Sequence, residues 1–267
     1  MTNPADNTWY FLTFQSQQLA ASVKLNGVPL FSDAQGRGGR ISMPVNPWIM
    51  PDSNKLGIEI LAETGENPEL EVQLFIHDNE SSSPKVGQML ASFSYPFQEE
   101  PPVVPLPLKK KIPVADEFLI KLPPAKLWTE AETINSLTEE DKQTILTLAD
   151  EVTKAFAEKN ITRLYELMDY RYNDQAVASY QSPERIKEVV HTQFGWIFDK
   201  ASDKIMPIPM DKEKVSFTLA ANNKLVLLHR EGGGEAVIFD DPIKKNETSI
   251  DIFASSINGK WCITRGI

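Results

Sequence analysis

The chain has 267 residues, with 27 basic side chains against 37 acidic ones and a formal charge of -10 at pH 7. An acidic surface repels phosphate, so this balance argues against nucleic-acid binding. No apolar run approaches the roughly 18 residues that a membrane-spanning helix needs. Cys262 is the only cysteine, which excludes a disulfide-stapled scaffold. The length and composition favour a soluble protein of two ordinary domains, with no nucleic-acid or membrane partner.

The first residues, 1–6, contain no Lys or Arg, and no apolar core follows them. A secretory signal needs both features, so a cytoplasmic location is expected for the chain as given.

The first half of the chain consists of short apolar runs broken by turn residues, which predicts strands rather than helices. Asn26-Gly27 lies between two of these runs, and this dipeptide favours a two-residue hairpin turn. Many short strands joined by Gly- and Pro-rich turns are typical of an all-β sandwich, expected over residues 1–124. The predicted strands are 9–14, 23–25, 28–30, 56–60, 70–76, 89–93 and 118–122.

Two loops in this half admit a binding role beside a structural one. The run 36–40, Gly-Arg-Gly-Gly-Arg, is interpreted as a flexible loop, with an anion-binding nest of backbone N–H groups as the alternative. Seven prolines lie between residues 99 and 124 and predict an extended edge connection, because proline cannot donate to a sheet. The alternative is a docking motif at 102–105 for a proline-reading partner. A linker is expected over 125–136.

The period of the apolar residues changes to that of helices after residue 137. Thr138 and Asp141 have the spacing of a capping box, and apolar residues between 145 and 156 form one helical stripe. Thr162 is expected to cap a second helix. Ser182 and Pro183 predict the start of a third, with a Ser cap and proline in the first turn.

Antiparallel strands follow the three helices, at 215–219, 225–229, 236–239, 250–254 and 261–264. Three helices against one face of a curved antiparallel sheet make an α+β domain. The order of a long helix, the helix 160–168 and the closing hairpin 258–263, Asn-Gly-Lys-Trp-Cys-Ile, resembles the nuclear transport factor two-like superfamily. The resemblance covers residues 137–267 and implies a cone-shaped domain with a cavity between the helices and the concave sheet. That superfamily contains isomerases, dehydratases, ligand binders and non-catalytic association modules, so function stays open.

Polar side chains that could line such a cavity come from two helices and one strand, and they are Tyr165, Asp169, Tyr172, His191, Trp196 and His229. No residue is assigned a catalytic role, because the chain contains no nucleophile elbow, phosphate loop or dinucleotide fingerprint. The three histidines are far apart and no paired-ligand motif exists, so neither a metal nor a cofactor is expected. Cys262, between Trp261 and Ile263, is interpreted as an inert strand residue.

Two functions from different classes are therefore considered. The first is a non-catalytic binding or interaction module, whose partner would be a protein or a small ligand held in the cone. The alternative is a lyase or isomerase of acid–base type, which would use Asp169 with Tyr172, or His229.

Phe253 falls on the opposite strand face from Ile252, so a different surface has to bury it. A second copy of the chain, favoured by the resemblance, and the β-sandwich of the same chain are the two alternatives.

Overall fold

The structure is a computed structural model that describes residues 8–77, 88–96, 110–112, 118–120, 125–200, 206–230, 235–241 and 246–266. The chain divides into two compact units, residues 1–125 and 126–267. The described part of the first unit contains strands and one short 3-10 helix, Asn46–Trp48. The strands are β1 Trp9–Gln17, β2 Leu19–Leu25, β3 Val28–Asp33, β4 Gly39–Pro44, β5 Asp52–Asn54, β6 Leu56–Glu63, β7 Glu69–His77, β8 Gln88–Tyr95, β9 Lys110–Ile112 and β10 Phe118–Ile120.

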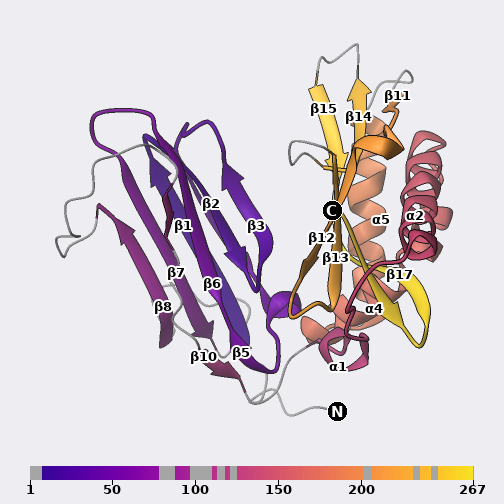
Figure 1. Cartoon of the computed structure of the whole chain (residues 1–267), viewed down its shortest axis with the longest axis horizontal. Helices are drawn as coiled ribbons and strands as arrows, with labels where there is room; N and C mark the ends of the chain where they lie inside the picture. The colour runs from indigo at the N-terminus through magenta and orange to yellow at the C-terminus, as the bar shows by residue number, and fades with distance from the viewer. Residues whose placement is uncertain are drawn as a thin grey trace. The chain divides into compact units, whose positions relative to one another are not determined.

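Two antiparallel sheets of four strands build the first unit, in the orders β4-β1-β7-β8 and β3-β2-β6-β9, and β10 pairs with β5. Strands of the two sheets form two layers in Figure 1. Alternate residues of each sheet point into one shared core, among them Leu12 and Phe14 of β1 and Val23 and Leu25 of β2, all fully buried. The strand alternation seen in the sequence therefore places the apolar face of each sheet inside.

The hairpin predicted at Asn26-Gly27 is confirmed. Both residues have a positive φ, 56° and 81°, as the two-residue turn between β2 and β3 requires. Most of the proline-rich segment, with the docking motif considered at 102–105, lies outside the described residues.

The loop after β3 is held by the carboxylate of Asp33. Its oxygens accept hydrogen bonds from the backbone N–H groups of Arg37 at 3.2 Å and Gly38 at 3.0 Å, and from the Ser16 hydroxyl at 3.1 Å. Gly36 and Gly38 have φ values of 60° and 81°, which glycine adopts at little cost. Two N–H groups of the anion-binding nest considered for residues 36–40 are therefore in place, and the anion that they bind is the carboxylate of Asp33.

Replacing Asp33 by asparagine should lower the free energy of unfolding by about 1 kcal/mol at pH 7, a small value because the site is partly exposed. Burial raises the pKa of Asp33, but the donors of Gly38, Arg37 and Ser16 outweigh it, so the pKa lies below its ordinary value. A lowered carboxyl pKa stabilises the fold above the unfolded-state value near about 4, and the stabilisation disappears as pH falls through the folded-state value. Urea unfolding at pH 7 and at pH 3 measures how this stabilisation depends on pH. If wild type and variant differ in free energy of unfolding by the same amount at both pH values, the prediction is contradicted.

The second unit begins with helices and ends with strands. Its described helices are α1 Leu127–Glu130, α2 Glu139–Ala157, α3 Ile161–Leu167, α4 Asp169–Ala178 and α5 Pro183–Lys200, with a short 3-10 helix at Lys212–Lys214. Its described strands are β11 Met206–Ile208, β12 Val215–Ala220, β13 Leu225–Arg230, β14 Val237–Asp241, β15 Asn246–Ile250, β16 Ile252–Ile257 and β17 Lys260–Arg265. They form two antiparallel sheets, ordered β12-β13-β16-β17 and β11-β14-β15. Within the part of the chain described, no helix is long and apolar enough to cross a membrane.

Two helices begin where the sequence predicts, and a third begins at a different residue. Thr138 and Asp141 form the capping box of α2, and Ser182 Oγ accepts the N–H of Arg185 at the start of α5. The second helix is capped by Asn160, not by Thr162, because Asn160 Oδ1 accepts the N–H of Arg163 at 3.0 Å. The described part of the unit contains five α-helices rather than the three expected, because α1 and α4 were not predicted.

Residues 126–136, expected as a linker, are instead part of the second unit. The ammonium of Lys224 donates to the carbonyl oxygens of Trp128 at 2.6 Å and Ala131 at 3.0 Å, so it caps the end of α1. Glu132 N–H donates to the carbonyl of Ser256 at 3.0 Å, which ties the segment to β16. The helix α1 has four residues, which are too few to show a helical period in the sequence.

Aromatic rings fill the core between the helices and the sheet. Phe156 of α2 stacks on Phe239 of β14 with ring centroids 4.2 Å apart, and Phe198 of α5 lies 5.0 Å from Phe156. Alternate residues of the sheet, including Val226 and Leu228, join this core. In Figure 1, α2 and α5 lie along the strands.

A buried ion pair joins α4 to the last strand. Arg265 Nη2 lies 2.7 Å from Asp174 Oδ2, and both side chains are less than 5% exposed. Asp174 Oδ1 accepts the N–H of Leu127 at 2.9 Å, and the Arg265 guanidinium lies 5.3 Å from the centre of the Trp128 ring. The charges of Asp174 and Arg265 therefore compensate one another where α1, α4 and β17 meet.

Candidate functional site

Three neighbouring hollows follow the helix α5. We call them by the helix that they border, and each is defined by its lining residues. The α3 hollow has a volume of about 550 Å³ and is lined by Ile161, Thr162, Tyr165, Glu166, Asp169, Lys187 and His191. The α4 hollow has about 510 Å³ and is lined by Arg171, Tyr172, Val190, Thr192, Gln193, Phe194, Trp196 and Ile197. The α5 hollow, of about 880 Å³, is lined by Glu184, Arg185, Lys187, Glu188, Val189, His191, Thr192 and Gln193.

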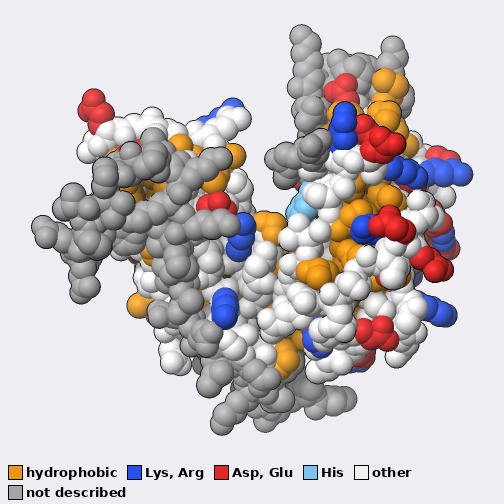
Figure 2. All heavy atoms as spheres, in the orientation of Figure 1, with side chains coloured by type: hydrophobic (Ala, Val, Ile, Leu, Met, Phe, Trp, Pro, Cys, Tyr) orange, Lys and Arg blue, Asp and Glu red, His pale blue; other side chains and the backbone are white. Residues whose placement is uncertain are grey.

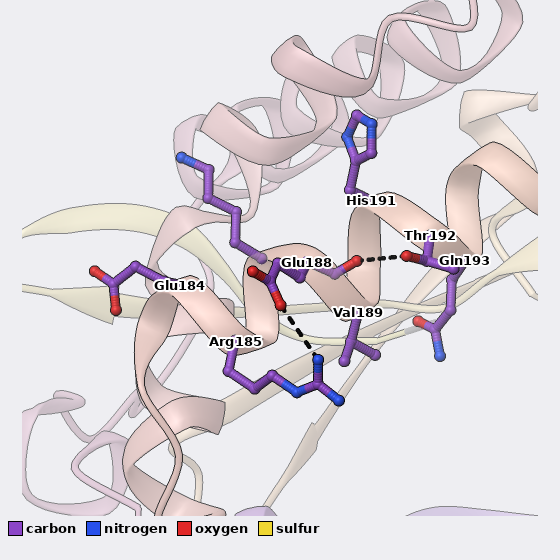
Figure 3. Close-up of a pocket in the computed structure, with 8 residues that line it drawn as sticks. Glu184, Arg185, Glu188, Val189, His191, Thr192 and Gln193 are labelled. Carbon is purple, nitrogen blue, oxygen red and sulfur yellow. Dashed lines mark hydrogen bonds and ion pairs between the residues drawn. The ribbon is translucent and has the colours of Figure 1, made fainter.

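The α3 and α4 hollows lie on opposite flanks of α5. His191, which lines the α3 hollow, points to the other side of the helix from Val189 and Gln193, as Figure 3 shows. Gln193 lines the α4 hollow. Trp196, one turn further along, is 63% exposed. Such exposure is unusual for a tryptophan, whose ring is largely apolar.

Two tyrosines whose rings contact each other at a tilt, Tyr165 and Tyr172, connect the two flanks. The rings of Tyr165 and Tyr172 have centroids 4.6 Å apart. Tyr172 is buried and its hydroxyl contacts the sulfur of Met168 at 3.3 Å, whereas the Tyr165 hydroxyl has no hydrogen-bond partner among the described residues. Burial, helped by the charge of Asp169, raises the pKa of Tyr165 to about 12. The hydroxyl of Tyr165 therefore stays protonated at neutral pH and can donate a hydrogen bond.

One cation lies against each tyrosine. Lys187 Nζ is 4.8 Å from the centre of the Tyr165 ring, and Arg171 Cζ is 5.0 Å from the centre of the Tyr172 ring. Neither cation forms an ion pair with a carboxylate in the described part of the chain. Sequence reasoning missed both residues, because whether a charge is neutralised depends on tertiary contacts.

The acids near these walls are engaged locally. Asp169 accepts a hydrogen bond from Asn173 Nδ2 at 3.0 Å. Glu166 pairs with Arg163 at 2.8 Å, and Glu188 pairs with Arg185 at 3.2 Å, the contact drawn as a dashed line in Figure 3. Asp169 and His191 are both exposed. Water therefore reaches the carboxylate of Asp169 and the imidazole of His191, whereas a catalytic acid or base works where water is excluded.

The six residues expected to share one cavity are separated by the structure. Tyr165, Asp169 and His191 line the α3 hollow, and Tyr172 and Trp196 line the α4 hollow. His229 lines neither, and its place in the helix-facing cavity is a wrong expectation. Its neighbour Leu228 points into the core under the helices, so His229 points to the opposite face of β13.

Cys262 and the metal-ligating residue types are the remaining candidates for chemistry. Burial raises the pKa of the Cys262 thiol to about 11, which keeps it protonated and unreactive at neutral pH. Among the residues that the structure describes, no group of three or more His, Cys, Asp and Glu side chains could hold a metal ion. Figure 2 shows acidic and basic side chains interspersed on the face of the second unit that it draws, rather than one patch of a single sign.

Of the three hollows, the α4 hollow is the candidate site, because its wall is mostly apolar and aromatic and its one cation, Arg171, has no carboxylate partner among the described residues. Comparison of the chain with protein-family models, with curated proteins and with solved structures found no match.

Proposed function

We propose that the protein is a non-catalytic binding protein, and that the α4 hollow of its second unit holds a small ligand. We further propose that this unit is a cone-shaped domain of the nuclear transport factor two-like type. Its α-helices precede a set of antiparallel strands, and its last two strands form a hairpin at Asn258-Gly259, which supports this assignment.

The observation that carries the proposal is the lining of the α4 hollow. Apolar side chains form most of the wall, and Arg171, Thr192 and Gln193 supply the polar groups. Ligand pockets commonly have this character, with volumes of about 300–1,000 Å³. Trp196 is 63% exposed at the rim, and a ligand that stacks on its ring would remove this apolar area from water.

A binding role is favoured over acid–base catalysis for two reasons. The core between the helices and the sheet is packed with the protein's own rings, including Phe156 and Phe239. Asp169, the carboxylate proposed for catalysis, is exposed in the α3 hollow, whereas its proposed partner Tyr172 lines the α4 hollow and His229 lines neither. The groups proposed for acid–base catalysis therefore do not line one shared cavity, as a catalytic pair requires.

Binding is tested by titrating the full-length protein with three naphthalene probes: the neutral 2-naphthamide, the anionic 2-naphthoate and the cationic 2-naphthylmethylamine. Amide NMR shifts should change mainly in 171–172 and 190–197, and Trp196→Ala should weaken binding of the best probe about tenfold, since its ring forms much of the wall. Tyr180→Ala is the matched control, because Tyr180 is 38% exposed outside the hollow.

Two outcomes would contradict the proposal. The first is that none of the probes shifts these residues. The second is that Trp196→Ala binds every probe as tightly as the wild type.

A further inference from the structure

We infer that the α4 hollow selects a monocarboxylate with a flat apolar body, whose carboxylate is held by the guanidinium of Arg171. This inference rests on the proposed function and adds the class of ligand to it. Three features of the hollow support this class of ligand: the charge balance inside the second unit, the shape of the guanidinium and the composition of the walls.

The two arginines of this region differ in their partners. Arg265 lies 2.7 Å from the carboxylate of Asp174, so its charge is compensated. Arg171 contacts the sulfur of Met168 at 3.8 Å and the face of the Tyr172 ring, neither of which carries a negative charge. Arg171 is half-buried, and a guanidinium that loses part of its hydration is destabilised unless an anion or several acceptors replace the water. Tyr172 also shares a side-chain hydrogen bond with Arg171 but is neutral, so a bound anion would supply the negatively charged partner that Arg171 lacks among the described residues.

The charge of Arg171 persists under physiological conditions. Burial lowers its pKa, and the positive charge of Arg265 lowers it further, but an arginine starts from a value far above neutrality. The hollow therefore presents a permanent cation, and the protein's overall charge of -10 does not neutralise it locally.

The guanidinium geometry and the walls indicate a carboxylate rather than a phosphate. A planar guanidinium matches a carboxylate through two parallel N–H···O bonds. Arg171 is the only cation that lines this hollow among the described residues, and its other polar groups, Thr192 and Gln193, are neutral. A single positive charge balances one negative charge, and a phosphate dianion would leave charge unpaired beside Phe194 and Ile197.

The α3 hollow on the opposite flank is less suited to an anion. Lys187 is exposed there, so water already solvates its ammonium. Glu166 and Asp169 line the same hollow and would repel a carboxylate. Lys187 therefore provides a matched control cation for Arg171.

The test compares 2-naphthoate with 2-naphthamide, two probes of nearly the same shape that differ in charge, by calorimetry on the full-length protein. The wild type should bind the carboxylate about tenfold more tightly than the amide. Arg171→Gln should abolish this preference and leave amide binding unchanged, whereas Lys187→Gln should change the preference by less than about twofold. Arg171→Lys keeps the charge but loses the two parallel N–H donors of the guanidinium, so it should retain part of the preference for the carboxylate.

The outcomes separate the ligand class from the proposed function. Equal binding of the two probes at the α4 hollow would overturn the carboxylate assignment and leave the binding role intact. If neither probe binds, the carboxylate assignment is overturned, and if the cationic 2-naphthylmethylamine does not bind either, the proposed function is overturned as well. Displacement of 2-naphthoate by inorganic phosphate at a lower concentration than the probe would also overturn the assignment. If Arg171→Gln does not fold, as its amide spectrum would reveal, the wild-type comparison and Arg171→Lys still decide the question.

Discussion

Replacing Asp174 by alanine should lower the free energy of unfolding of the second unit by about 3–5 kcal/mol. The substitution leaves the buried guanidinium of Arg265 without its carboxylate, and it removes the acceptor of the Leu127 N–H. The cost of the lost partner exceeds the value of the pair itself, because both side chains are less than 5% exposed and water does not replace the carboxylate. Urea unfolding of the full chain, followed through amide signals of α4 and β17, measures this loss.

Two variants identify the charge as the cause. Asp174→Asn keeps an acceptor for Leu127 and should lose less stability than alanine. The double variant Asp174→Leu with Arg265→Met removes both charges and should recover most of the loss, because apolar residues of similar volume often replace a buried pair at little cost. If Asp174→Ala costs below about 1 kcal/mol, or if the double variant is less stable than Asp174→Ala, the loss of a carboxylate beside a desolvated Arg265 is not the explanation.

Replacing Phe156 by alanine should cost about 3–5 kcal/mol in the same measurement. Phe156 is 1% exposed and contacts rings from α5 and β14, so its removal leaves a cavity between helix and sheet. The stacked contact with Phe239 adds to the lost burial.

Phe156→Leu fills part of that space and should lose clearly less than alanine. Trp196→Ala serves as the control for a large aromatic side chain on the surface, and its effect should stay within about 0.5 kcal/mol. A loss below about 1 kcal/mol for Phe156→Ala would mean that the core collapses around the cavity.

Local signals in the sequence were sufficient where a few adjacent residues determine the backbone. The capping box at Thr138 and Asp141, the Ser182-Pro183 helix start and the Asn26-Gly27 turn are each satisfied within one turn of chain. The stripe that ends at Phe156 likewise predicted a buried helical face, because its period is that of an α-helix.

Features that depend on distant partners were not predictable in this way. The helix α1 lies in a segment without periodicity and is held by Lys224, nearly a hundred residues later in the chain. His229 was ambiguous because both faces of β13 are apolar, so alternation did not identify the face toward the helices. Arg171 and Arg265 have the same side chain, and the tertiary partner Asp174 of the second is what separates them.

The loop closed by Asp33 has a consequence for how the protein discriminates among anions. Its carboxylate is tethered four and five residues from the Arg37 and Gly38 amides that it engages, and tethering gives such a group an effective concentration that a dissolved ion reaches only in the millimolar range or above. A free phosphate or carboxylate must displace this resident competitor and leave its charge unsatisfied. The carboxylate of Asp33 therefore already occupies the amides to which a dissolved anion would bind in the glycine-rich loop. At Arg171 no acidic side chain of the described residues has to be displaced.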